Sequence, residues 1–238
     1  MPELIDLEVS HYIRTEFFLK LLKTKRLYLG RLDTQKNDPK DGCLPTANLA
    51  PPSGLNEQYY SYFPTKRDPQ MNLEQQGIAR QLSYIHCWFK GHKESRQMWE
   101  DFGSNGTGVC IQSTTARLKN SIRSGWPNNL IFTIHECPYT DSIVQVPEFL
   151  PDIASVRKDS SFKDQQEIRI LAQVDVTKGS APLPGPDHKL VPVDLDALLS
   201  RIIIGSAMPL EEERAISDAI VEMGLQTPVV RSVVQPGG

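Results

Sequence analysis

The sequence lacks any apolar run near the roughly 18 residues that a membrane-spanning helix needs. It also lacks a signal peptide pattern, because the opening MPELIDLEVS has no basic stretch followed by an apolar block. Hydrophobic residues make up 39% and charged residues 23% of the 238 positions, a balance that excludes a disordered or fibrous chain. We therefore expect a globular cytoplasmic protein with no membrane partner.

Cysteine is scarce, and its spacing excludes both a C-x-x-C zinc site and a disulfide scaffold. The four cysteines, Cys43, Cys87, Cys110 and Cys137, form no C-x-x-C pair and are too scattered for a disulfide scaffold. The five histidines show neither H-x-x-x-H nor H-E-x-x-H spacing. No G-x-S-x-G motif is present either, so a serine hydrolase has no support. We expect no metal cofactor.

Charge of one sign does not dominate, since the net charge is -3. Basic residues nevertheless gather early in the chain, at Lys20, Lys23, Lys25, Arg26 and Arg31. Two interpretations of this cluster stay open. It is either a solvated helix face or a local patch that holds nucleic acid.

The pattern of apolar residues predicts alternating helices and strands. In TEFFLKLLK, Thr15 is expected to be the N-cap, and Phe17, Phe18, Leu21 and Leu22 are expected to form an apolar stripe. Further strands are expected at RLYLGRL, LSYIHCWF, VCIQ, LIFTIHE, EIRILAQV, RIIIG and TPVVRSVV, and further helices at ESRQMWEDF and PLEEERAISDAIVEMG. This order predicts an α+β fold with a mixed, mainly antiparallel central sheet flanked by helices.

The domain organisation follows from proline content. We predict a single globular domain over residues 1–234, in which 35–79 is a Pro-rich insertion or lid, and a disordered tail over 235–238. The glycines at 103, 106 and 108 lie between a helix and a strand rather than between a strand and a helix. They therefore indicate a turn and not a dinucleotide-binding fingerprint.

Two predicted elements carry residues of interest. In ESRQMWEDF, Met98 and Trp99 are expected to anchor the helix against the sheet. In EIRILAQV, side chains alternate, so Ile168 and Ile170 face the core while Gln165, Glu167 and Arg169 share the other face. That polar face is either part of a pocket, with Glu167 facing a cleft, or an exposed surface on which Glu167 and Arg169 form a weak pair.

Four blocks together resemble the bacterial domain-of-unknown-function family 2971, over about residues 8 to 233. They are SHYIRTEFFLKLLKTKRLYLGRLDTQKNDPKDG, YIHCWFKGHKESRQMWEDFGSNGTGVCI, FKDQQEIRIL and VDLDALLSRIIIGSAMPLEEE. The order of these motifs is in turn similar to that of the ADP-ribosyltransferase group. That group has a basic residue on its first strand, a polar or aromatic residue in the middle and a Glu-x-Glu or Gln-x-Glu late in the sheet.

The resemblance implies a set of site residues for NAD. The catalytic pair would be Glu167, which stabilises the oxocarbenium-like ribose, and Gln165, which orients the acceptor. The cofactor-binding residues would be His11, Tyr12, Ser95, Trp99 and Arg169. Among them, His11 would hydrogen-bond the adenosine-side ribose and Tyr12 would stack on nicotinamide. The family more often has an acid where Gln165 stands, which speaks against arginine as the modified side chain.

The resemblance therefore predicts an NAD-dependent ADP-ribosyltransferase-like enzyme, an effector of the toxin or phage-defence kind. NAD would be its substrate, and its partners would be an acceptor, protein or nucleic acid, and a protein of a defence system. Two alternatives stay open. One is a non-catalytic interaction or sensor module of a bacterial defence system, and the other is a nucleic-acid-processing protein that uses the basic cluster.

Overall fold

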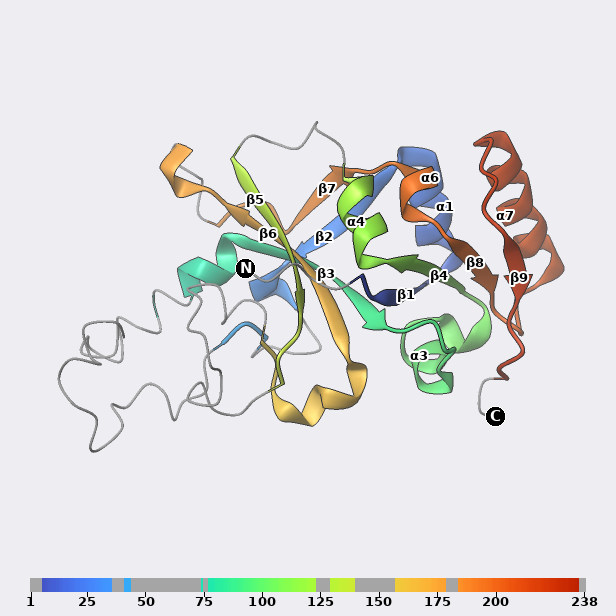
Figure 1. Cartoon of the computed structure of the whole chain (residues 1–238), viewed down its shortest axis with the longest axis horizontal. Helices are drawn as coiled ribbons and strands as arrows, with labels where there is room; N and C mark the ends of the chain where they lie inside the picture. The colour runs from blue at the N-terminus through green and yellow to red at the C-terminus, as the bar shows by residue number, and fades with distance from the viewer. Residues whose placement is uncertain are drawn as a thin grey trace. The chain divides into compact units, whose positions relative to one another are not determined.

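The computed structural model describes residues 6–35, 41–43, 74, 77–122, 129–139, 157–178 and 184–235. They adopt the predicted α+β fold, with a mixed, mostly antiparallel sheet flanked by helices (Figure 1). The chain divides into two compact units. The first unit comprises residues 1–28, 87–127 and 190–238, and the second comprises residues 29–86 and 128–189.

The first unit is built on antiparallel pairs with one parallel addition. Strand β1 (Glu8–Ile13) pairs along its whole length with β4 (Val109–Thr114), and β4 pairs with β8 (Arg201–Ile204). Strand β9 (Val229–Arg231) joins β8 in parallel. Its helices are α1 (Thr15–Thr24), α3 (Arg96–Asp101), α4 (Thr115–Ser121), α6 (Leu195–Leu198) and α7 (Leu210–Glu222). Helices α1 and α7 pack against each other.

Helix α1 departs from its prediction at two positions. Arg14 is the N-cap, and Thr15 is instead the first helical residue, whose hydroxyl donates to the Thr107 carbonyl at 3.0 Å. Phe18 and Leu21 are buried as expected, whereas Phe17 is 51% exposed. At about 100° per residue, Phe17 lies outside the arc that the buried residues define.

The turn after α3 confirms the interpretation of its glycines. A short 3-10 turn (Ser104–Gly106) separates α3 from β4. A Cβ on Gly205 would lie 2.0 Å from the Gly106 carbonyl oxygen, so the backbone of the turn packs directly on the end of β8. A Cβ on Gly103 would lie 2.3 Å from the Trp99 ring, and one on Gly108 would lie 2.5 Å from the Ile13 carbonyl oxygen, so these two glycines allow close packing within the turn.

In the second unit, β5 (Leu130–Glu136) pairs antiparallel with β6 (Glu167–Val174), and β6 neighbours β3 (Ser83–Lys90). Strand β2 (Arg26–Arg31) pairs antiparallel with β3, and β7 (His188–Pro192) pairs with β2. Three 3-10 turns complete the unit, at Leu32–Thr34, Ser160–Gln165 and Val176–Lys178. Strands β2, β3 and β7 each begin in one unit and end in the other.

The burial of β6 confirms one half of its prediction and corrects the other. Ile168 and Ile170 are buried as expected. Glu167, Arg169 and Leu171 on the opposite face are buried as well, so the interpretation of that face as an exposed surface is wrong. A strand covered on both sides must pair any charge that it carries.

The predicted insertion and the predicted C-terminal tail lie mostly outside the described residues and are not tested. Of the predicted insertion or lid at 35–79, only residues 35, 41–43, 74 and 77–79 are described, and of the predicted tail at 235–238 only Gln235. The single domain over 1–234 stays a prediction. Within the described ranges, no helix combines the length and the apolar content of a membrane span.

Candidate functional site

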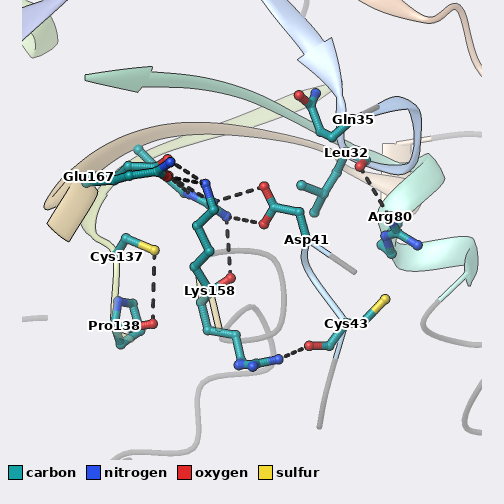
Figure 2. A network of polar contacts seen from close by, with 12 residues as sticks. Leu32, Gln35, Asp41, Cys43, Arg80, Cys137, Pro138, Lys158 and Glu167 are labelled. Atoms are coloured by element: carbon teal, nitrogen blue, oxygen red, sulfur yellow. Dashed lines mark hydrogen bonds and ion pairs between the residues drawn. The ribbon is translucent and has the colours of Figure 1, made fainter. Parts of the chain in front are cut away.

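A buried network of four charged side chains lies in the second unit (Figure 2). Its members are two carboxylates and two cations: Asp41, Glu167, Lys158 and Arg169. None is more than 8% exposed, and Arg169 is completely buried. Isolated charges are costly to bury, so the equal number of positive and negative groups is what allows them to lie here.

The position of Glu167 follows from its place at the start of β6. The backbone turns through Gln166, whose φ of 42° is left-handed, and then enters the strand. The N–H of Glu167 donates to the Tyr139 hydroxyl at 2.7 Å, and its carbonyl accepts from the N–H of Cys137 at 2.8 Å. The backbone of Glu167 is thus held on both sides, which fixes the direction of its side chain.

Lys158 connects the two residues predicted to be catalytic. Its Nζ donates to Oε1 of Glu167 at 2.7 Å and to Oε1 of Gln165 at 2.6 Å. The same ammonium lies 4.6 Å from the centre of the Phe162 ring, within cation–π range. Gln165 and Glu167 therefore point their oxygens at one positive charge.

Arg169 joins the two carboxylates of the network. Its Nε and Nη2 both lie 2.9 Å from Oε2 of Glu167. Its Nη1 and Nη2 donate to Oδ1 and Oδ2 of Asp41 at 2.7 and 3.0 Å, which is a bidentate pair. Such charge-assisted double hydrogen bonds are stronger than neutral ones and hold both partners in a fixed orientation.

The charges set the ionisation of the acids. Burial raises the pKa of Glu167, but the charges of Arg169 and Lys158 lower it more, so its pKa lies below the usual value. For Asp41, burial outweighs the attraction of Arg169 and raises the pKa. Burial likewise raises the pKa of the nearby Cys137 thiol to about 12, which keeps it from reacting as a thiolate. Because its pKa lies below the usual value, Glu167 is ionised at physiological pH.

The interpretation of Glu167 and Arg169 as a weak surface pair is wrong, because both are buried and each has further partners. Sequence reasoning missed those partners, Asp41 and Lys158. The sequence did contain one sign that Arg169 has a buried partner. Arg169 interrupts the apolar run IRILA, so a strand buried on both faces would require a carboxylate from elsewhere in the chain.

The first unit brings together three of the predicted cofactor-binding residues. The Tyr12 ring meets the Trp99 ring edge-on, with centroids 4.9 Å apart, and the Tyr12 hydroxyl accepts from the Ser95 N–H at 3.0 Å. Ser95 caps α3 by accepting from the N–H of Met98, and Trp99 donates from Nε1 to Glu94 at 3.0 Å. Trp99 is fully buried, which confirms it as an anchor of its helix, and Met98 is partly buried. These contacts fix α3 against β1.

His11 precedes Tyr12 on β1 and so faces the other side of the strand. One ring nitrogen, Nδ1, lies 3.0 Å from the Cys87 carbonyl, and the ring is tilted against Trp88 at 5.3 Å between centroids. Burial lowers the pKa of His11 to about 4, despite that hydrogen bond. His11 is therefore neutral at physiological pH, with Nδ1–H as the donor.

The depressed pKa of His11 predicts a loss of stability in acid. Between pH 6.5 and about 4, His11 binds a proton in the unfolded state but not in the folded state. The free energy of unfolding therefore falls as pH falls through this window. We expect His11 to account for roughly 1 to 3 kcal/mol of that fall. Urea unfolding at pH 7 and pH 4.5 measures it. In His11→Asn, which retains a donor but does not titrate, the fall should shrink; an equal fall in both proteins would contradict the assignment.

The predicted site residues thus form two sets. Gln165, Glu167 and Arg169 lie in the second unit, and the other four, His11, Tyr12, Ser95 and Trp99, lie in the first. No protein-family profile, curated protein or solved structure matches the chain. The resemblance to family 2971 and to the ADP-ribosyltransferase group therefore stays a prediction. Among the described residues, no three His, Cys, Asp or Glu side chains are grouped so that they could hold a metal ion.

Proposed function

We propose that the protein is an NAD-dependent ADP-ribosyltransferase-like enzyme in which Glu167 is the catalytic carboxylate. One observation carries the proposal: the carboxylate of the ionised Glu167 and the amide oxygen of Gln165 both accept hydrogen bonds from the same positively charged group, the ammonium of Lys158. A site that stabilises a cation between these two oxygens meets the electrostatic demand of an oxocarbenium-like ribose.

In the proposed reaction the bond between nicotinamide nitrogen and ribose C1′ breaks, and its electron pair leaves with nicotinamide. Positive charge develops on the ribose and is stabilised by the carboxylate of Glu167. A nucleophilic atom of the acceptor, oriented by Gln165, then bonds to C1′ and releases its proton to water. The products are nicotinamide and the ADP-ribosylated acceptor.

The two cations have different roles in this proposal. Arg169 contacts Oε2 of Glu167 and is also held by Asp41, so it keeps the carboxylate in place. Lys158 contacts the other oxygen, Oε1. When NAD binds, Lys158 exchanges this contact for the diphosphate, which frees Oε1 for a ribose hydroxyl.

The residues of the first unit take no step in this proposal. Tyr12 and Trp99 are buried against each other, and Ser95 caps a helix, so their described contacts are those of a packed core. The proposed setting, a bacterial effector of the toxin or phage-defence kind with a partner protein, follows from the family resemblance.

The function is tested on the full chain with NAD. We expect a measurable heat of NAD binding by calorimetry, and transfer of label from ³²P-NAD to a component of cell extract together with release of nicotinamide. ADP-ribose, which has no nicotinamide to release, is the matched ligand control. A protein that shows no heat of binding and no labelled product would instead support a non-catalytic interaction module.

Replacing Lys158 tests its proposed exchange onto the diphosphate. In Lys158→Gln the ammonium is lost while a polar side chain of similar reach remains. We expect the KM for NAD to rise about tenfold or more, the typical cost of losing one charge-assisted contact, with a smaller change in kcat. Steady-state nicotinamide release measures both constants. A lower KM in the variant would show that Lys158 merely obstructs the site.

A further inference from the structure

A cluster of four cations covers the end of α1 and the start of β2 in the first unit. It consists of Lys20, Lys23, Lys25 and Arg26, and all four are exposed. Arg31, which the sequence placed in the same patch, does not belong to it. Arg31 is only 6% exposed and pairs with Asp33 at 2.6 Å and Asp187 at 3.3 Å.

The ion pairs among the described residues do not include this cluster of four cations. Within the part of the chain that the structure describes, none of the four joins an ion pair, whereas Arg14, Arg31, Arg169 and Arg231 each contact a carboxylate. Lys23 in the last turn of α1 benefits from the helix dipole, and Glu16 lies one turn before Lys20, but Lys20 and Lys23 also lie one turn apart and repel each other. An anionic partner would relieve this repulsion.

Two exposed aromatic rings flank the cluster. Phe17 lies one helical turn before Lys20 and is 51% exposed. Tyr28 is 53% exposed and shares a face of β2 with Arg26, while Leu27 and Leu29 on the other face are buried. Each ring thus presents apolar surface to solvent beside a basic side chain.

We infer that this surface binds single-stranded nucleic acid. Phosphates would contact the four cations, and unpaired bases would stack on Phe17 and Tyr28, the combination by which proteins hold single strands without reading sequence. A membrane fits less well, because the outward face of α1 offers only one apolar ring among Glu16, Lys20 and Lys23. The inference does not depend on the proposed enzyme activity.

The test measures the fluorescence anisotropy of a labelled twelve-nucleotide oligo(dT) with the full chain and no NAD. The logarithm of the binding constant should fall with the logarithm of salt concentration with a slope of about -3, for four phosphate contacts on a single strand. Lys23→Gln and Arg26→Gln should each reduce the slope by about 0.7. Phe17→Ala and Tyr28→Ala should weaken binding about fivefold or more and leave the slope unchanged.

Arg214→Gln is the matched control, because Arg214 is an exposed cation on α7, a different helix of the same unit. It should bind like the wild type, and equal melting temperatures would show that all variants are folded. The inference would be overturned by no binding at low salt, by an equal loss in Arg214→Gln, or by tighter binding to a duplex. Binding to phosphatidylserine vesicles without binding to oligo(dT) would also overturn it.

Discussion

Glu167→Gln is expected to fold and to lose ADP-ribosyl transfer by at least about a hundredfold, the usual effect of removing one electrostatic contact to a transition state. The substitution keeps the shape of the side chain and removes its charge. Because Glu167 is ionised and faces both Lys158 and Arg169, the variant also leaves these cations short of one partner. Some loss of stability is therefore expected as well, and the rate must be measured at a temperature where the variant is folded.

Asp41→Asn is the control that separates chemistry from stability. Asp41 contacts the same guanidinium, that of Arg169, and its removal takes one negative charge from the same buried network. Asp41 does not contact Glu167 or the reacting atoms and acts on the site only through Arg169, so we expect a comparable fall in the urea midpoint with a much smaller fall in nicotinamide release. Equal loss of rate in the two variants, or wild-type rate in Glu167→Gln, would contradict the role of Glu167.

Arg169→Met is expected to be the most destabilising single change in the second unit, at about 3 to 5 kcal/mol of unfolding free energy. Arg169 is fully buried and pairs with two carboxylates. Its loss therefore leaves both Asp41 and Glu167 buried without this ion-pair partner. Urea unfolding measures the difference. Lys178→Met is the matched control, because that lysine pairs with Asp175 at the surface and should cost less than about 1 kcal/mol.

Measuring the stability of Arg169→Met over a range of pH shows whether the unpaired charges of the two carboxylates cause its destabilisation. Without the guanidinium, burial would raise the pKa of both carboxylates in the folded variant, so protonation would favour folding. The deficit of Arg169→Met relative to wild type should therefore shrink as pH falls from 7 toward 4. A deficit that stays constant over this range would point to lost packing instead.

The sequence predicted the parts of this protein that local rules govern. Period-two alternation was enough to place Ile168 and Ile170 in the core, and the helix-to-strand context was enough to interpret the glycines before β4 as a turn. The failure on Arg169 has a physical cause. Its partner Asp41 is 128 residues away in the chain, and no periodicity links the two.

Phe17 shows a second limit of the sequence pattern. An apolar residue next to Phe18 reads as part of the same stripe, yet only the packed structure decides where the buried arc of α1 ends. That error is informative, since a large ring left in solvent beside cations is part of the surface that we assign to nucleic acid.

The make-up of the two units bears on how the protein folds during its synthesis. The first unit is assembled from three separate stretches of the chain, and the second from two. On the ribosome, β1 and β4 emerge long before β8 and β9, so the first unit stays incomplete until synthesis passes residue 231. Folding dominated by such distant pairings is slow, and truncation series will not isolate either unit as a working fragment.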